Sequence, residues 1–225
     1  PEHSSSHIER FLQMCSSSSS PESIDTEAKV NWSVCYPTLP SQYFHLLRRQ
    51  VLRPFRKPLI VLSPKIIFRH PECQSSLKHF DESSHFESVL DDPVHSSPQS
   101  RNGVNTIVLC SGKVYFQLNE LRHKEGMDNV AIVRIEELCP FPVQSIVKIL
   151  KHYPNVSRHK LFWFQEEHKN QGAYQFVDCR LQNVANIKLN YLGRSESELP
   201  ATGSTSLHKK ELEQLMRELR ARLSQ

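Results

Sequence analysis

The feature that most constrains this chain is a regular alternation of apolar runs and amphipathic segments from residue 105 onward. Apolar runs rich in Val, Ile and Leu are typical of strands that helices cover on both faces of a parallel sheet. The sequence therefore predicts an α/β protein with a mostly parallel, doubly wound sheet. The predicted strands occupy 105–112, 129–138, 160–167 and 187–194, and the predicted helices occupy 113–126, 141–154 and 172–184.

The part of the chain before residue 105 predicts a piece of a second α/β unit. An opening helix is expected over about 6–15, followed by a serine-rich loop and a short strand at 31–37. A helix is expected to begin at Pro40, because proline is favoured in the first helical turn. Its apolar residues recur at helical spacing: Phe44, Leu47 and Val51.

The stretch between Pro58 and Pro64 is a continuous apolar run, which predicts a strand buried on both faces of a parallel sheet. Residues from about 64 to 104 are rich in Pro, Ser, His and Asp with little periodicity, so we expect an irregular connection that ends in a mobile loop. The predicted organisation is the end of one α/β domain, a connection, and a C-terminal α/β domain, with bounds 1–70, 71–104 and 105–225.

A last helix over about 207–223 carries an apolar stripe opposite lysines and arginines. The stripe is expected to pack on the sheet, and a groove for a partner helix is the alternative. Its members are Leu212, Leu215, Met216, Leu219 and Leu223.

Composition excludes several classes of protein. The 225 residues carry a net charge of +4 that is spread along the chain, which is too weak and dispersed to predict nucleic-acid binding. No apolar run approaches the roughly eighteen residues that a membrane span requires. The six cysteines lie far apart without a CxxC pair, so they predict buried, reduced thiols rather than a zinc site.

Candidate ligand-binding residues follow the predicted strands, because open parallel sheets bind ligands beyond the carboxyl ends of their strands. Ser111 and Lys113 follow the first strand and favour an anion site, with a glycine turn as the structural alternative. A denser polar cluster follows the third strand. It is a candidate ligand-binding site, and the alternative is that these residues only cap a helix and carry surface charge. Its members are Gln165, Glu166, Glu167, His168 and Asn170.

Two further groups are candidates. Lys65 and Arg69 follow the apolar run after Pro58 and form a basic cluster that can bind a phosphate, a carboxylate or an acidic neighbouring subunit. Glu2, His3 and Ser4 open the chain with a carboxylate, an imidazole and a hydroxyl. The motifs of P-loops, dinucleotide sites, serine hydrolases and zinc proteases are absent from the sequence, and no metal site is predicted.

Several long motifs follow one another in a fixed order along the chain: "PEHSSSHIERFLQMC", "FHLLRRQVLRPFRKPLIVLSPK", "RHPE", "SGKVYF", "DNVAIVRIEELCPFP", "QEEHKNQGAY" and "YLGRSESELPATG". Together they resemble one family, the decarboxylating first component of thiamine diphosphate-dependent 2-oxo acid dehydrogenases of the 2-oxoglutarate type. The resemblance covers essentially the whole chain except the serine-rich loop and 91–104, and it implies the C-terminal part of a much longer enzyme.

The resemblance implies that His3 is the active-site histidine, with Glu2 and Ser4 near the substrate. An imidazole there can donate a hydrogen bond to the intermediate or move a proton near neutral pH. Many members carry Arg where this chain has His7, so a fixed positive charge at that position is in doubt. Lys65 and Arg69 are the counterparts expected for a regulatory acetyl-CoA site.

The resemblance further implies thiamine diphosphate and Mg²⁺ in the longer enzyme, with their main binding motifs outside this chain. It implies a homodimer that works with dihydrolipoamide succinyltransferase and dihydrolipoamide dehydrogenase, in the mitochondrial matrix, within the tricarboxylic acid cycle. The favoured substrate is 2-oxoglutarate, and 2-oxoadipate is the alternative. A different class of function also remains open: a structural module for dimerisation or effector binding, inactive by itself.

Overall fold

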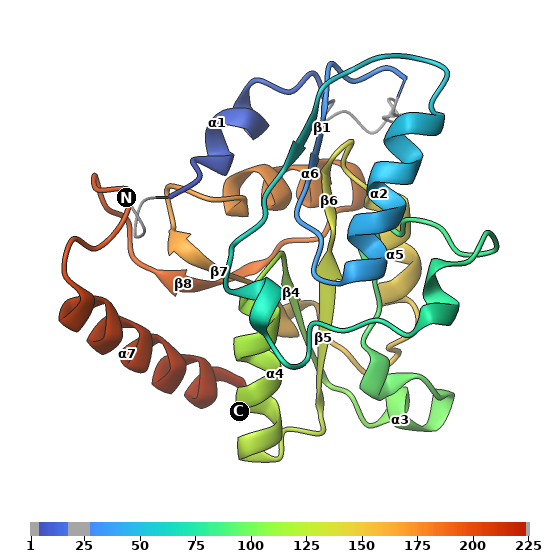
Figure 1. Ribbon diagram of the computed structural model, residues 1–225. Coiled ribbons are helices and arrows are strands. Elements are labelled where there is room, and N and C mark those ends of the chain that lie inside the picture. The colour runs from blue at the N-terminus through green and yellow to red at the C-terminus, as the bar shows by residue number, and fades with distance from the viewer. Residues whose placement is uncertain (1–4, 18–27, 224–225) are drawn as a thin grey trace.

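The structure is a computed structural model that describes residues 5–17 and 28–223. Helices and strands alternate along the chain and build two sheets (Figure 1). The strands are β1 (Ser33–Cys35), β2 (Leu59–Val61), β3 (Val89–Leu90), β4 (Thr106–Cys110), β5 (Val130–Ile135), β6 (Glu137–Cys139), β7 (Leu161–His168) and β8 (Asn190–Arg194). The α-helices are α1 (Ile8–Gln13), α2 (Pro40–Leu52), α3 (Pro98–Asn102), α4 (Val114–Glu125), α5 (Val143–Leu150), α6 (Tyr174–Ala185) and α7 (Thr205–Leu223). The 3₁₀ helices are η1 (Ile67–Arg69), η2 (Leu77–Phe80), η3 (Pro93–His95) and η4 (Arg158–Lys160).

The larger sheet has the strand order β3-β5-β4-β7-β8. Strands β5, β4, β7 and β8 run parallel, and β3 pairs antiparallel with β5 at one edge. Helix α4 covers one face, and α5 and α6 cover the other (Figure 1). The predicted fold class, a mostly parallel doubly wound sheet, is confirmed. Strand β3 was not predicted, because two residues inside a proline-rich and serine-rich segment give no periodic signal.

The central strands show why the apolar runs are continuous. Every residue of β4 and β5 is buried, because helices cover both faces of this sheet. Arg134 is the one charged side chain within β5. Its guanidinium donates to the Thr38 hydroxyl at 3.0 Å and lies 4.1 Å from the centre of the Tyr115 ring. Contacts of this kind make burial of an arginine tolerable.

The smaller sheet has the order β2-β1-β6, with β2 parallel and β6 antiparallel to β1. The strand predicted between Pro58 and Pro64 exists as β2, but the prediction that both its faces are buried was wrong. All of its residues are half-buried, because β2 is the edge strand. Strand β6 follows β5 after one residue and so links the two sheets. The domain bounds 1–70, 71–104 and 105–225 remain a prediction.

Helix α2 forms where Pro40 predicts it, but its apolar stripe does not face the core. The residues that it buries are Ser41, Gln42, His45 and Leu46. The exposed positions are instead the ones that recur at helical spacing, Phe44, Leu47 and Val51. Periodicity therefore located this helix but does not indicate which of its sides is buried.

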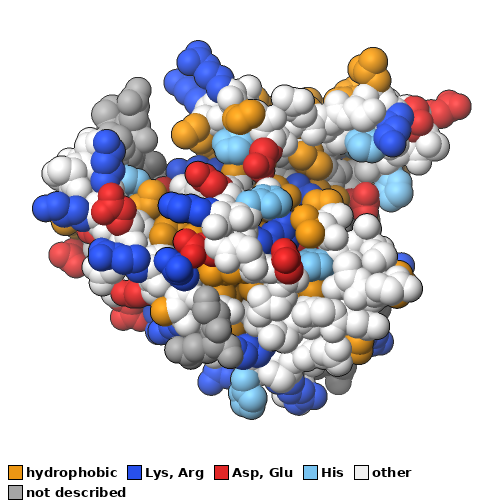
Figure 2. Space-filling model, turned by 90° about the horizontal axis from the view of Figure 1, so that it is seen from below, with side chains coloured by type: hydrophobic (Ala, Val, Ile, Leu, Met, Phe, Trp, Pro, Cys, Tyr) orange, Lys and Arg blue, Asp and Glu red, His pale blue; other side chains and the backbone are white. Residues whose placement is uncertain are grey.

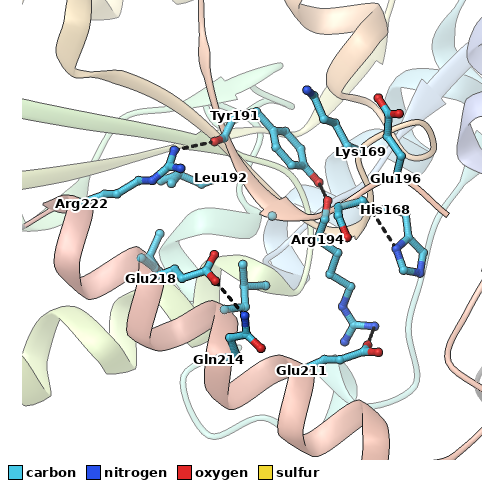
Figure 3. Close-up of a pocket in the computed structure, with 14 residues that line it drawn as sticks. His168, Lys169, Tyr191, Leu192, Arg194, Glu196, Glu211, Gln214, Glu218 and Arg222 are labelled. Atoms are coloured by element: carbon cyan, nitrogen blue, oxygen red, sulfur yellow. Dashed lines mark hydrogen bonds and ion pairs between the residues drawn. The ribbon is translucent and has the colours of Figure 1, made fainter.

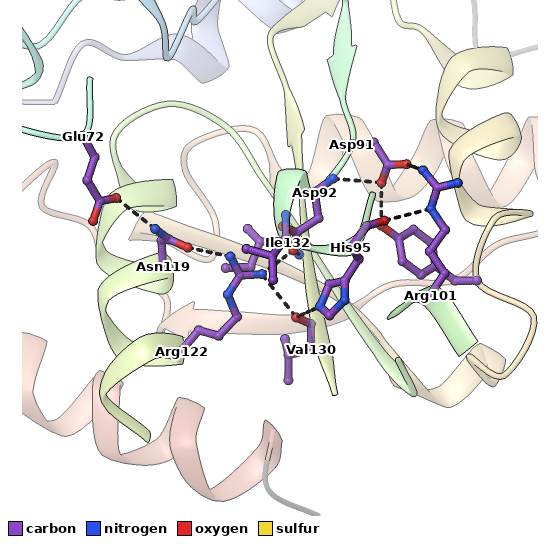
Figure 4. Close-up of polar contacts among 11 residues, drawn as sticks. Glu72, Asp91, Asp92, His95, Arg101, Asn119, Arg122, Val130 and Ile132 are labelled. Carbon is purple, nitrogen blue, oxygen red and sulfur yellow. Dashed lines mark hydrogen bonds and ion pairs between the residues drawn. The ribbon is translucent and has the colours of Figure 1, made fainter. Parts of the chain in front are cut away.

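The connection between the two predicted domains is held by two neighbouring aspartates (Figure 4). Asp92 is buried, pairs with Arg122 of α4, and accepts a hydrogen bond from the Ile132 amide at 2.7 Å. Asp91 accepts from the Tyr153 hydroxyl at 2.6 Å and from Arg101 at 2.9 Å. The segment that was expected to end in a mobile loop is thus fastened to β5, α4 and the end of α5.

Helix α7 packs through the apolar stripe that the sequence predicts. Leu215, Leu219 and Leu223 are buried in the main hydrophobic core, which also contains residues of β4, β5 and β7. The opposite side carries both basic and acidic residues, and blue and red side chains are mixed where α7 lies on the face seen in Figure 2. The prediction that this stripe packs within the protein is confirmed. No helix among the described residues is long and apolar enough to cross a membrane.

The six cysteines are all free, but the prediction that they are all buried was only half right. Cys35, Cys110 and Cys139 are buried in strands, where burial raises the pKa of the Cys35 and Cys110 thiols. Cys15 and Cys73 are half-buried and Cys179 is exposed on α6. Apolar neighbours in the sequence predicted correctly that the cysteines in strands are buried. They did not indicate that Cys179 lies on the exposed side of its helix.

Candidate functional site

Two of the predicted clusters meet at the carboxyl edge of the larger sheet. Strands β4 and β7 are neighbours, but the connection after β4 leads to β5 on one side and the connection after β7 leads to β8 on the other. Such a switch point leaves a crevice in which α/β proteins bind ligands. Residues 111–113 follow β4, and 165–168 form the end of β7. The structure thus brings these two predicted groups together.

The contact between them is an ion pair. Lys113 Nζ lies 2.6 Å from Glu166 Oε2, and 31% and 22% of the two side chains stay exposed. The Ser111 hydroxyl donates to the Ile135 carbonyl at 2.8 Å. Both groups that were predicted to receive an anion therefore already have partners within the protein. An anion at this edge would have to compete with Glu166 for Lys113.

Gln165 organises the turn from β7 into α6. Its side-chain oxygen accepts from the indole of Trp163 at 2.9 Å and from the amides of Ala173 and Tyr174 at 3.1 and 2.9 Å. Its amide nitrogen donates to the Gln171 carbonyl at 2.7 Å. This buried side chain acts as a structural hub, because both its oxygen and its nitrogen have partners within the turn.

Tyr36 joins the smaller sheet to this edge. Gly112 has φ +72°, and a Cβ there would lie 2.1 Å from the Tyr36 ring, so only glycine allows this close approach. Burial raises the pKa of the Tyr36 hydroxyl, and the nearby Glu167 and Glu166 raise it further. The alternative interpretation of residues 111–113, a turn that requires glycine, therefore fits the packing of Gly112 against the Tyr36 ring.

Glu167 is the carboxyl of this cluster whose pKa is raised. Burial raises its pKa above the ordinary value of 4.5, although a hydrogen bond from its own backbone amide lowers it; Glu166 and Glu9 add to the effect of burial, and Lys113 opposes it. Lys113 forms its ion pair with Glu166 and not with Glu167. The edge therefore combines a carboxylate that is paired with a lysine, Glu166, and a neighbouring carboxyl whose pKa is raised, Glu167.

The opening helix α1 reaches the same edge. Glu9 Oε2 accepts a hydrogen bond from the Gly172 amide at 3.1 Å, and Glu9 Oε1 lies 3.1 Å from His7 Nδ1. His7 has a left-handed backbone, with φ 53°. Glu2, His3 and Ser4, the predicted catalytic group, lie outside the described residues. The part of the opening motif that is described is thus anchored beside the switch point.

A second charged group at this edge was missed by sequence reasoning. Arg194, at the end of β8, pairs with Glu211 of α7 at 3.0 Å and lies 3.0 Å from His208 Nδ1. Burial lowers the pKa of His208, and Arg194 lowers it further. The rule that ligand-binding residues follow strands would have found Arg194 had it been applied to the last strand. No sequence signal connects His208 to this edge.

The remaining predicted residues do not join the cluster. Asn170 ties down a loop, because its side chain donates to the Ser197 carbonyl at 2.9 Å and accepts from the Ser197 amide at 3.0 Å. Lys65 lies just before η1 and Arg69 is its last residue. Both side chains are exposed, and neither makes an ion pair with another described residue. Across residues 5–17 and 28–223, no group of three or more His, Cys, Asp or Glu is arranged to hold a metal ion.

A cavity of about 770 Å³ lies beside this edge, between β8 and α7 (Figure 3). Its strand side includes Tyr191 and Arg194, its helix side includes Gln214 and Glu218, and His168 lies at its rim. Acidic and basic side chains line it in similar numbers, so its charge favours no one class of ligand. Lys113 and Glu166 do not line this cavity.

Comparison with known families agrees with this architecture. Residues 1–71 match the family model described as "Transketolase, pyrimidine binding domain", which places the first part of the chain among the transketolase-like α/β proteins. Residues 74–219 match the model described as "2-oxoglutarate dehydrogenase C-terminal". The chain belongs to the 2-oxoglutarate dehydrogenase family, as its motifs predicted.

Similar proteins carry two names. The chain is 43% identical over 217 residues to the "2-oxoadipate dehydrogenase complex component E1" of Xenopus laevis, covering 96% of this chain and 22% of that protein. It is 40% identical over 223 residues to the "2-oxoglutarate dehydrogenase E1 component" of Azotobacter vinelandii, covering 97% and 22%. A Dictyostelium discoideum homolog of the 2-oxoadipate component is 39% identical over 220 residues, covering 96% and 24%. The chain thus spans less than a quarter of the length of these relatives.

Proposed function

We propose that this chain is the C-terminal part of an E1 component that decarboxylates 2-oxoglutarate on thiamine diphosphate and transfers the succinyl group to lipoamide. The observation that carries the proposal is that residues 1–71 and 74–219 match two family models in order, and that E1 relatives match nearly the whole chain. The activity would belong to the longer protein. The chain by itself would be inactive and would contribute the end of the pyrimidine-binding domain and the C-terminal domain.

Within this function, we assign the catalytic role to His3, with Glu2 and Ser4 beside the substrate. An imidazole suits the task, since it can stabilise negative charge that develops on the intermediate and can exchange a proton near neutral pH. Among the described residues, the support is that Glu9 of α1 accepts a hydrogen bond from the Gly172 amide, which anchors the described part of the opening motif beside the switch point.

The cofactor would be thiamine diphosphate, with Mg²⁺ binding its diphosphate. The carboxylates at the switch point do not fit the metal, because Glu166 is paired with Lys113 and no group of three or more metal-binding side chains is arranged there among the described residues. We therefore assign no described residue to the diphosphate or the metal. What the chain would supply to the cofactor is one wall of the site, formed by the opening motif.

The substrate distinction remains part of the proposal. We favour 2-oxoglutarate because "QEEHKNQGAY" and "RHPE" resemble that branch over more positions than "HIERFLQMC" resembles the 2-oxoadipate branch. The second candidate is 2-oxoadipate, because relatives such as those of Xenopus laevis and Dictyostelium discoideum carry that name at similar identity. The two acids differ by one methylene, which a pocket discriminates by about 1–3 kcal/mol.

A chimera tests the proposal. The chain replaces the matching quarter of the Azotobacter vinelandii E1 component, and ferricyanide reduction is measured with 2-oxoglutarate and with 2-oxoadipate. We expect turnover that requires thiamine diphosphate and is faster with 2-oxoglutarate. His3→Ala should lower kcat/KM by about 10- to 1,000-fold, whereas the exposed His123→Ala should leave it unchanged. A folded but inactive chimera, or an active His3→Ala variant, would contradict the proposal.

The chain alone provides the complementary experiment. With thiamine diphosphate, magnesium and 2-oxoglutarate we expect no ferricyanide reduction above the blank. Turnover by the isolated chain would contradict its assignment as one part of a longer enzyme. It would equally exclude the purely structural module, the different class of function that the sequence leaves open.

By the same resemblance we propose the partners and location. The longer enzyme would be a homodimer and would work in a multienzyme complex with dihydrolipoamide succinyltransferase and dihydrolipoamide dehydrogenase. Its location would be the mitochondrial matrix. An acetyl-CoA effector site at Lys65 and Arg69 is consistent with the exposure of both side chains. In the chimera, acetyl-CoA should raise the melting temperature, and Lys65→Ala with Arg69→Ala should abolish the shift. An unchanged shift in that variant would exclude this site.

A further inference from the structure

The chain enters helix α1 through a bend in the backbone at His7. This residue has φ 53° and ψ 44°, in the left-handed region that residues other than glycine seldom adopt. Its amide donates a hydrogen bond to the Ser5 hydroxyl at 3.1 Å, on the other side of the bend. Because a backbone in this region persists only where neighbouring contacts hold it, the contacts of His7 determine the direction in which the opening motif joins the helix.

Helix α1 does not depend on the bend for its own place in the fold. Ile8 and Leu12 are 3% and 2% exposed and belong to the main hydrophobic core. Beyond the end of the helix, Arg180 of α6 donates to the Ser17 carbonyl at 2.8 Å, and α1 lies beside α6 in Figure 1. The apolar side of α1 and its far end therefore hold the helix, and the polar contacts at its start act on the bend instead.

Glu9 connects the bend to the turn between β7 and α6. Its Oε1 lies 3.1 Å from His7 Nδ1, and its Oε2 accepts a hydrogen bond from the Gly172 amide at 3.1 Å. The Glu9 side chain is only 17% exposed, so water competes little for either oxygen. The two oxygens of one carboxylate are thus engaged on opposite sides, one by the bend and one by the turn.

The turn that binds Glu9 is held from inside the protein. Gly172 has φ +69°, and a Cβ at this position would lie 2.7 Å from Gln165 Nε2. Gln165 is itself 4% exposed and accepts a hydrogen bond from the indole of Trp163 within β7. The Gly172 amide therefore has a fixed position relative to the larger sheet, and Glu9 transmits that position to His7.

We propose that Glu9 is a positioning residue for catalysis by the opening motif, because it holds the bend at His7 against the Gly172 amide. The inference rests on the proposed function, in which His3 of this motif is the catalytic residue. Glu9 acts through His7 and is assigned no contact with substrate or cofactor. A catalytic group displaced by about 1 Å can lose about 100-fold in rate, so a bend that is free to change lowers turnover more than substrate binding.

The test uses the chimera with the Azotobacter vinelandii E1 component, with kcat and KM for 2-oxoglutarate measured by ferricyanide reduction. Glu9→Ala should lower kcat by about 10- to 100-fold and change KM by less than about twofold. Glu9→Gln should retain most of the wild-type kcat, because its amide oxygen can still accept from the Gly172 amide. The melting temperatures of both variants should agree with the wild type, since Ile8 and Leu12 keep α1 in place.

Two substitutions of His7 test the bend itself. Glycine adopts a left-handed backbone without steric cost, whereas a β-branched residue opposes it. We therefore expect His7→Val to lower kcat at least as much as Glu9→Ala does, and His7→Gly to lower it less. The matched control is Glu120→Ala, at an exposed position of α4, which should leave kcat and KM unchanged.

The outcomes separate this inference from the proposed function. An active chimera whose kcat is unchanged in Glu9→Ala would overturn the inference and leave the proposed function intact. Equal losses in Glu9→Ala and Glu9→Gln would also overturn it, because the negative charge and not the hydrogen bond to Gly172 would then matter. A lower melting temperature that accounts for the lost activity would assign Glu9 to stability instead. A chimera that is inactive, or that stays active in His3→Ala, would overturn both.

Discussion

Gln165 shows how one buried side chain determines the geometry of a whole edge. Replacing it by leucine keeps the approximate volume but leaves the indole of Trp163 and the amides of Ala173 and Tyr174 without their acceptor. Buried donors that lose their partner cost about 1–3 kcal/mol each. We expect Gln165→Leu to lower the free energy of unfolding by about 3 kcal/mol or more, measured by urea denaturation.

The control for this prediction is Gln182→Leu, at an exposed position of α6. It should change the free energy of unfolding by less than about 0.5 kcal/mol, as surface substitutions usually do. Equal effects of the two substitutions would contradict the role of Gln165 as the hub of this turn.

Glu167 predicts a pH dependence of stability. Its pKa in the folded chain is raised above the ordinary 4.5, mainly by burial, so the folded state keeps a proton that the unfolded chain has released. Stability from this group is therefore fully present below about pH 4.5 and is lost as the pH rises through the raised pKa. We expect the free energy of unfolding to fall less steeply with pH in Glu167→Gln than in the wild type.

The comparison uses denaturation between pH 4.5 and neutrality, with Glu198→Gln as the control, since Glu198 is exposed. The control should follow the wild-type slope. Parallel slopes for Glu167→Gln and the wild type would show that Glu167 does not keep its proton in the folded chain.

At the scale of single residues, the sequence found which side chains follow the strands but not what they contact. Ser111, Lys113 and Glu166 were correctly placed at strand ends, because strand ends can be read from where apolar runs stop. The pairing of Lys113 with Glu166 depends on β4 and β7 being neighbours, which is a property of strand order. Whether Glu2, His3 and Ser4 act in catalysis remains a prediction.

At the scale of elements, α7 provides a direct test of its packing. Leu219 is fully buried, whereas Leu207 on the same helix is 49% exposed. Leu219→Ala should cost about 2–5 kcal/mol, the loss expected when a buried leucine leaves a cavity. Leu207→Ala, the matched control, should change stability by less than about 0.5 kcal/mol. If both leucines proved equally tolerant of substitution in thermal or urea unfolding, the stripe would face a partner instead of the core.

Helices α2 and α7 differ in how well periodicity predicted them. In α7 the apolar stripe faces the core, because its neighbours are apolar residues of the larger sheet and its helices. In α2 the neighbours include the carbonyl groups of residues 75–87, which need donors, so polar side chains such as Gln42 and His45 turn inward. Periodicity identifies a helix, but the chemistry of what covers it decides which side is buried.

At the scale of the whole molecule, the two sheets are joined by several kinds of contact. Glu136, between β5 and β6, accepts a hydrogen bond from the Thr38 amide at 2.8 Å, and Arg49 of α2 pairs with Glu137 of β6. One hydrophobic cluster extends from Ile8 to Leu223. We therefore expect the two sheets to unfold as one cooperative unit.

The two tryptophans allow this to be measured, because Trp32 lies just before β1 and Trp163 lies within β7. In Trp32→Phe the fluorescence reports the larger sheet, and in Trp163→Phe it reports the smaller one. We expect the fluorescence transition of each variant to coincide with its own far-ultraviolet circular dichroism transition, as two-state unfolding requires. Separate midpoints within either variant would mean that the two sheets unfold independently.

The sequence by itself determined the fold class, the alternation of helices and strands after residue 105 apart from the division of the predicted strand 129–138 into β5 and β6, and membership of the 2-oxoglutarate dehydrogenase family. These follow from local patterns, because a helix or strand with one buried side repeats its apolar residues at the period of that element. The tertiary structure decided which strands are neighbours, that Lys113 meets Glu166, that Glu9 reaches the Gly172 amide, and that α2 exposes its apolar side. Each of these depends on contacts between residues far apart in the chain, which no local pattern encodes.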